Sequence, residues 1–168
     1  MANEQQQEMT RLWQASYGRL RAYFMQRAGK AQEVDELVQE CFLRAWKSWD
    51  QYGGRGSRKS WLFAIARHLL IDRIRRKGLP IQGGTEVIES TAQVPEQDAH
   101  RQSIYDLIER EIAALPEILR DVMDLRYAGQ LSYAEIAQTL GVPVGTVRSR
   151  LHRAITTIRM KVVPTDEC

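Results

Sequence analysis

Cysteine and histidine are scarce in this chain, and long apolar runs are missing from it. Its 168 residues include two cysteines and three histidines, all far apart, so we expect neither a disulfide framework nor a metal site. No run approaches the roughly 20 apolar residues of a membrane span. Residues 1–8 are polar and lack the hydrophobic stretch of a signal peptide. We therefore expect a cytoplasmic protein with no direct membrane insertion.

Residue combinations that are typical of catalytic sites are also missing from the sequence. The sequence has no glycine-rich phosphate loop, no paired metal carboxylates on a basic face and no Cys–His pair. An enzyme of nucleic-acid chemistry would need such a set. We therefore predict that the chain is not an enzyme, and that it has no catalytic residues, no metal and no cofactor.

Strand patterns are absent as well, whereas apolar residues recur at helical intervals. The fold class is therefore predicted to be all-α. Residues 78–99 contain several prolines and glycines and show little periodicity, which predicts a flexible linker between two small helical domains. Limited proteolysis is expected to cut first within residues 80–98. Helices are expected over residues 7–28, 32–49, 60–77, 101–115, 116–128, 132–140 and 143–163.

The stretch 131–155 has the signals of a helix-turn-helix. Ser132 followed by Glu135 is a capping box, which begins a helix. Gly141 ends that helix, because glycine accepts the left-handed conformation that a helix end often needs. Pro143 suits the first turn of the next helix. Two helices with this short glycine turn are typical of a DNA-binding helix-turn-helix.

The second of these helices is predicted to have a buried stripe and a basic outer face. Thr146, Ser149 and Arg153 point away from the stripe, with Arg148 and His152 on its flanks. Such a face fits a major groove, where arginines contact phosphates or guanine edges. An ordinary helical hairpin with a solvated basic face remains the alternative. The predicted stripe consists of Val144, Val147, Leu151, Ile155 and Ile158.

Charge is distributed unevenly along the chain, although the net charge is only +3. Residues 1–77 carry a net charge of +7, residues 78–130 carry −6 and residues 131–168 carry +2. Two basic blocks separated by an acidic one indicate two separate contacts with a polyanion.

The two helices predicted over residues 32–49 and 60–77 have different polar faces. The first has a face rich in carboxylates around Asp35–Arg44, which is either a solvated surface or a docking face for a basic partner. The second is basic and aromatic and follows the glycine-rich loop 51–57, a combination that suits single-stranded nucleic acid. For Trp61, packing in the core is the favoured role.

Three segments resemble conserved regions of bacterial sigma factors, the promoter-specificity subunits of RNA polymerase. Residues 35–46 resemble part of the second conserved region, residues 61–76 resemble the promoter-melting helix, and residues 143–154 resemble the recognition helix. Their order and spacing are similar to those of the extracytoplasmic-function (ECF) group, over roughly residues 8–162. The resemblance implies residues 1–79 as sigma region 2, 80–100 as a linker and 101–168 as sigma region 4.

The resemblance also implies partners and contact residues. Core RNA polymerase and promoter DNA, both duplex and melted, are the implied partners, and an anti-sigma factor is a further one that the sequence leaves undecided. The implied polymerase-binding residues are Asp35, Glu36, Leu37, Gln39, Glu40 and Arg44. Those implied for the minus-ten element are Arg58, Lys59, Ser60, Trp61, Arg67, His68, Arg75 and Arg76. Those implied for the minus thirty-five element are Thr146, Arg148, Ser149, His152 and Arg153.

Two features depart from the family pattern, and one other function stays open. His68 stands where the family usually has asparagine, and the loop 53–56 is unusually rich in glycine, so base preference does not follow from the resemblance. The alternative function is a stand-alone helix-turn-helix transcriptional regulator that binds a palindrome as a dimer. The carboxylate face at Asp35–Arg44 argues against it, because a sensory domain needs no such face.

Overall fold

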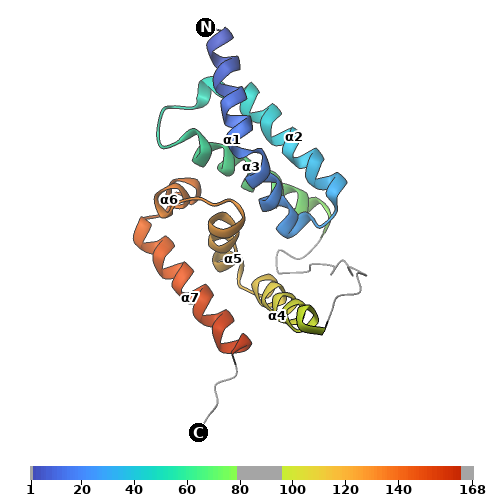
Figure 1. Ribbon diagram of the computed structural model, residues 1–168. Coiled ribbons are helices and arrows are strands. Elements are labelled where there is room, and N and C mark those ends of the chain that lie inside the picture. The colour runs from blue at the N-terminus through green and yellow to red at the C-terminus, as the bar shows by residue number, and fades with distance from the viewer. Residues whose placement is uncertain (1, 79–95, 164–168) are drawn as a thin grey trace.

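The computed structural model describes residues 2–78 and 96–163, and every regular element in those ranges is helical (Figure 1). This confirms the predicted all-α fold with two helical domains. The predicted linker and its expected proteolysis fall mostly on residues 79–95, which lie outside the described residues. The N-terminal domain has α1 (Ala2–Ala28), α2 (Ala31–Lys47), a 3₁₀ turn η1 (Trp49–Gln51) and α3 (Arg58–Arg76). The C-terminal domain has α4 (Glu96–Ala113), α5 (Glu117–Met123), a π-helical turn η2 (Asp124–Ala128), α6 (Tyr133–Leu140) and α7 (Val144–Val162).

The helix ends follow the capping signals of the sequence. At the start of α6, the Glu135 amide donates to Ser132 Oγ over 3.1 Å, and the Ser132 amide donates to Glu135 Oε2 over 2.8 Å. Gly141 ends the helix with φ of +66°, a conformation in which a side chain would be strained. The predicted capping box and glycine stop are both confirmed. Helix α4 begins at Glu96, five residues before the predicted start at Arg101.

The N-terminal domain packs α1, α2 and α3 around one apolar core (Figure 1). Each large side chain buried in this way stabilises the fold by about 1.5–3 kcal/mol. Cys41 is fully buried in it, as predicted for a small core residue. Trp46 is 43% exposed instead of buried, because it lies at the edge of the wide apolar face of α2, beyond the reach of α1 and α3. Core residues with no exposed surface include Leu20, Phe24, Val34, Cys41, Leu62 and Phe63.

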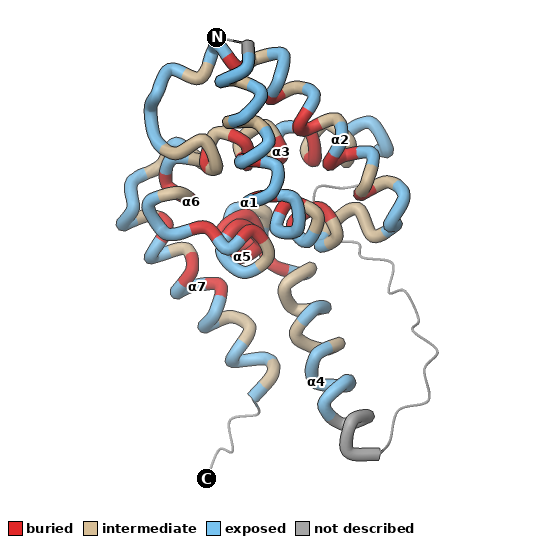
Figure 2. The backbone as a smooth tube through the Cα atoms, turned by 45° about the horizontal axis from the view of Figure 1, so that its top comes forward, coloured by how far each residue is buried: buried red, intermediate tan, exposed pale blue. Residues whose placement is uncertain are grey.

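The C-terminal domain is built around the short helix α5, which is buried along most of its length (Figure 2). Helix α7 packs on α4, α5 and α6 through Val147, Leu151 and Ala154. Two members of its predicted stripe, Val144 and Ile155, are 39% and 36% exposed. The buried stripe of α7 is therefore narrower than predicted. Ile155 lies at its edge and Val144 lies in the first turn of the helix, and the described neighbours cover neither residue completely.

The two domains are in direct contact, which the sequence did not predict. Helix α3 packs on α6 and α1 packs on η2, so the buried residues of both domains form one continuous core. Gly129 is one reason for the close approach: a Cβ atom there would lie 2.9 Å from Phe63 Cε1. None of the described helices has the length and apolarity required to cross a membrane.

Candidate nucleic-acid and polymerase interfaces

The side chains of Asp35, Glu36 and Glu40 on the polar face of α2 are each about half exposed, and each pairs with an arginine of the same domain. Asp35 lies 3.2 Å from Arg21 Nε, and Glu40 lies 2.8 Å from Arg44 Nε. Glu36 lies 3.4 Å from Arg73 Nη2. Because these side chains face solvent, such pairs contribute only about 0.2–1 kcal/mol each. The carboxylates can therefore change partners at low cost.

This face also presents apolar groups that the sequence reasoning missed. Leu43 and Trp46 are both nearly half exposed, and they follow Gln39 on the same side of α2 at helical spacing. Leu37, in contrast, is buried in the core, so it supports the helix from inside and does not form part of the surface. The signal that could have found Trp46 is the width of the apolar pattern on α2, which is too broad for two neighbouring helices to cover.

At the start of α3, Arg58 is enclosed by aromatic rings. Its guanidinium carbon lies 3.9 Å from the centroid of the Trp49 ring and 4.5 Å from that of Tyr52. Its Nη2 donates to Glu8 Oε2 over 2.6 Å. Trp61 completes the cluster, with its ring 5.5 Å from that of Tyr52. Arg58 therefore holds the rings of Trp49 and Tyr52 in place beside the loop 51–57. Trp61 is only half-buried.

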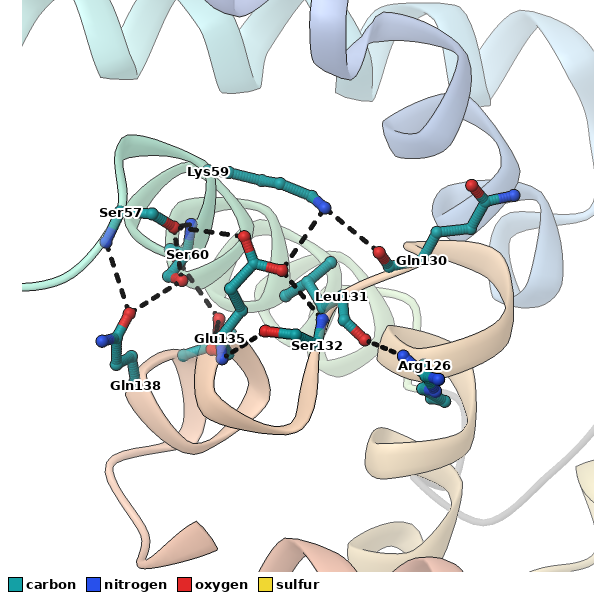
Figure 3. Close-up of polar contacts among 10 residues, drawn as sticks. Ser57, Lys59, Ser60, Arg126, Gln130, Leu131, Ser132, Glu135 and Gln138 are labelled. Carbon is teal, nitrogen blue, oxygen red and sulfur yellow. Dashed lines mark hydrogen bonds and ion pairs between the residues drawn. The ribbon is translucent and has the colours of Figure 1, made fainter.

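Three of the residues expected at the minus-ten element are held by the C-terminal domain, and Figure 3 shows Lys59 and Ser60 among them. Lys59 Nζ donates to the Gln130 carbonyl over 3.1 Å and lies 3.4 Å from Glu135 Oε2. The Ser60 hydroxyl donates to Gln138 Oε1 over 3.1 Å. Arg67, further along α3, donates to Asp121 Oδ2 through Nε over 3.1 Å and through Nη2 over 2.8 Å.

The pKa of Glu135 reflects this contact. Burial alone would raise the pKa of its carboxyl, but the hydrogen bond from the Ser132 amide and the charge of Lys59 lower it by more. The pKa therefore lies below its ordinary value. Glu135 is a carboxylate at neutral pH, where it both caps α6 and attracts Lys59.

A second group of ion pairs joins the domains and is almost completely buried. Arg27 of α1 bonds to Glu117, to Asp121 over 3.2 Å and to Asp124 over 2.7 Å. The side chain of Arg27 is only 3% exposed. Burial alone would lower the pKa of Arg27, but the carboxylates around it raise the pKa on balance, so the guanidinium stays charged. No local sequence pattern predicts this pairing, since Arg27 and Glu117 lie 90 residues apart in the chain.

The outer face of α7 is open to solvent. Arg148, Ser149, His152 and Arg153 are all exposed, and Thr146 is half-buried. Within residues 2–78 and 96–163, no carboxylate forms an ion pair with Arg148, Arg150 or Arg153. Gly145 has open space around it, so the first turn can approach a neighbour closely. His68, Arg75 and Arg76 of α3 are exposed as well.

Two family models match this chain. Residues 12–79 match the model of sigma-70 region 2, and residues 105–158 match that of sigma-70 region 4. The ECF RNA polymerase sigma factor SigW of Bacillus subtilis is 32% identical over 145 residues, which are 80% of this chain and 78% of SigW. The chain belongs to the ECF sigma factors.

Other relatives of this sigma factor are of the same kind. The ECF sigma-E factor of Escherichia coli is 34% identical over 146 residues, which cover 79% of this chain and 75% of that protein. ECF sigma factor SigC of Mycobacterium tuberculosis is 36% identical over 135 residues, which cover 79% of this chain and 72% of SigC. Family membership decides between the two functions left open by the sequence, since a stand-alone regulator has no need of sigma region 2.

Solved structures with the same fold are more distant in sequence. The sigma factor RpoE of Bartonella quintana, solved with the anti-sigma factor NepR, has a TM-score of 0.63 at 23% identity, covering 96% of this chain and 97% of that one. CnrH, solved with the cytosolic domain of CnrY, has a TM-score of 0.62 at 21% identity, and the match covers 96% of this chain and 89% of the CnrH chain. These similarities confirm the fold of both domains.

Proposed function

We propose that this sigma factor directs core RNA polymerase to promoters through three separate faces. Helix α2 docks on polymerase, α3 with the loop 51–57 takes the melted minus-ten strand, and α7 reads the minus thirty-five element as duplex. The corresponding domains are residues 1–79 and 101–168. The observation that carries the proposal is the open face of α7, on which basic and hydroxyl groups project from a helix whose opposite side is buried.

The polymerase contact combines charge with apolar surface. Asp35, Glu36, Gln39, Glu40 and Arg44 supply the polar part, and the exposed Leu43 and Trp46 supply the apolar part. Interfaces between proteins are typically of this mixed kind, with large apolar side chains at the centre and polar groups around them. This mixture supports a protein partner for α2 better than it supports DNA.

Further parts of the proposal rest on the family. The chain acts in the cytoplasm without catalysis of its own, since its chemistry is that of the polymerase it directs. The two structural relatives were solved with partner proteins, and one of these is named as an anti-sigma factor. An anti-sigma factor that responds to an envelope or stress signal is therefore a partner we propose for this chain too.

Charge reversal on α2 tests the polymerase contact. The double variant Asp35→Lys/Glu40→Lys places two positive charges on the proposed docking face, and it should bind core polymerase far more weakly than the parent. Because complementary charges mainly govern encounter and register, the loss should be larger at low salt. Binding of labelled sigma factor to core polymerase is the measurement.

A matched variant separates this effect from a general change of charge. Glu109 and Asp106 lie on α4, away from α2, so Asp106→Lys/Glu109→Lys adds the same charge elsewhere. Circular dichroism checks that both proteins stay helical. A folded Asp35→Lys/Glu40→Lys protein that binds polymerase as tightly as this control would refute the docking role of α2.

A further inference from the structure

Contacts with the C-terminal domain cover three of the eight side chains that are proposed to meet the minus-ten strand. Groups of the C-terminal domain bind Lys59 and Ser60 (Figure 3), and they also bind Arg67. The Ser57 amide also donates to Gln138 Oε1 over 3.3 Å, and the Thr139 hydroxyl donates to the Ser60 carbonyl over 3.2 Å. The start of α3 is therefore occupied by side chains of α6.

The groups that occupy this face have the chemistry of a nucleic-acid strand. The carboxylates of Glu135 and Asp121 lie against Lys59 and Arg67, as phosphate oxygens would. The amide oxygen of Gln138 accepts hydrogen bonds at the mouth of the loop 51–57, where a base edge would do the same. Lysine and arginine bind carboxylates and phosphates through the same charge-assisted hydrogen bonds.

The loop itself is shaped to admit Gln138. Gly56 has φ of +78°, and a Cβ atom there would lie 2.5 Å from Gln138 Oε1. The Tyr52 hydroxyl donates to the Gly56 carbonyl, which holds the loop in the conformation that receives this side chain. The close approach thus depends on the glycine that makes the loop unusual.

We propose that this contact is autoinhibitory: in the free chain, α6 and the adjoining Asp121 occupy the strand-binding face of α3, and the domains must separate before the minus-ten strand can bind. The inference rests on the proposed function, because it takes Lys59, Ser60 and Arg67 as strand contacts. Since both domains belong to one chain, their contact is intramolecular, and a strand has to compete with a high effective concentration of α6.

The contact is built so that it can open. Its pairs at the start of α3 are partly exposed, so each contributes little. The buried group around Arg27 regains water when the domains part, and solvation offsets most of the lost ion-pair attraction. Core polymerase and promoter DNA, by binding each domain separately, would supply energy that shifts the equilibrium toward separated domains.

The test loosens the contact without touching α3. In Glu135→Gln/Gln138→Ala, glutamine keeps the capping box of α6, but the charge facing Lys59 and the amide facing Ser60 are lost. The control, Glu109→Gln/Gln14→Ala, makes the same replacements at exposed positions on α4 and α1. Fluorescence anisotropy measures binding of the full-length proteins to a labelled single-stranded DNA oligonucleotide of mixed sequence. The loosened variant should bind about tenfold more tightly than the control, as expected when two hydrogen-bonded contacts to a competitor are removed.

A second readout follows the domains directly. Dyes placed at Arg55→Cys and Thr156→Cys, in a Cys168→Ser background with the buried Cys41 retained, report their separation by energy transfer. Transfer should fall in the loosened variant and not in the control. The inference would be overturned if the domains separated in the loosened variant without a gain in its affinity for the strand. It would also be overturned if the loosened variant and the control had equal energy transfer and equal strand affinity.

The proposed function can be refuted separately from the autoinhibitory contact. If the parent neither binds core polymerase nor supports promoter-specific transcription, the proposed function is wrong and the inference with it. If the parent does both, while the loosened variant behaves like the control, only the autoinhibitory contact is refuted.

Discussion

Helices α3 and α7 are both basic and are both proposed to bind DNA. The C-terminal domain covers part of the basic face of α3, whereas the basic face of α7 is exposed to solvent. The arginines on the outer face of α7 meet no carboxylate within the described part of the chain, whereas Lys59 and Arg67 of α3 are each paired across the domain boundary. The difference comes from their surroundings more than from their own sequences. Arg67 of α3 pairs with Asp121 of the acidic block. Helix α7 packs on α4 and α5 of the same block through its apolar side and turns its basic face to solvent.

The acidic block thus has a definite structural role. Residues 78–130 carry a net charge of −6 beside an N-terminal part of +7. Glu117, Asp121 and Asp124 from this block surround Arg27, and Asp121 also reaches Arg67. In the sequence, the acidic block only separates two basic regions proposed to contact DNA. In the structure, its carboxylates neutralise basic side chains of the N-terminal region.

The largest effect is expected at Arg27. Replacing it in Arg27→Met leaves three carboxylates at the domain boundary without their main counter-ion, which disfavours the closed arrangement by about 3–5 kcal/mol. The domains should then separate while each keeps its helices. Small-angle X-ray scattering should show a larger radius of gyration at unchanged circular dichroism. The control is Arg19→Met, an exposed position on the same helix, and equal radii for the two variants would contradict the role of Arg27.

A smaller effect is expected on the open face. Arg153→Ala removes an exposed charge from α7, and it should weaken promoter duplex binding by about 1–3 kcal/mol if it reads a base. Binding of the single strand should not change, because α7 takes no part in the covered face. Affinities for both DNA forms can be compared by anisotropy. Unchanged duplex affinity and unchanged sequence preference in a folded variant would rule out base reading by Arg153.

The smallest effect concerns pH. Because the pKa of Glu135 is lowered in the folded protein, its carboxylate stabilises that state above its ordinary pKa of 4.5, and this contribution is lost as the pH falls through the lowered value. Glu135→Gln should therefore be less stable than the parent at neutral pH, by less than about 1 kcal/mol, and equal to it in strong acid. Denaturant unfolding at several pH values measures the difference, and a difference that grows on acidification would contradict the assignment.

Much of the fold could be predicted because its signals are local. The capping box at Ser132, the glycine stop at Gly141 and the helical spacing of the core residues depend on neighbours within a few positions, and the structure has them all. The errors concern how widely each helix is covered. Trp46, Val144 and Ile155 have the right spacing for burial, but the described neighbours leave more than a third of each residue exposed.

The residues of the candidate sites could be named from the sequence, but their environment could not. Resemblance to the family indicated Lys59, Ser60 and Arg67, while their partners Glu135, Gln138 and Asp121 lie 54 or more residues away. No local pattern encodes such a pairing. Leu37 is a related case: the family resemblance implied a polymerase contact for it, and its side chain is buried in the core.

The central claim is that the strand-binding face of α3 is closed in the free chain, and the reactivity of Lys59 tests it most directly. Lys59 and the exposed Lys47 can be compared in one sample by limited acetylation and mass spectrometry. We predict that Lys59 reacts much more slowly than Lys47 in the parent, and that its rate rises toward that of Lys47 in Glu135→Gln/Gln138→Ala. Equal rates for the two lysines in the free parent protein would contradict the account.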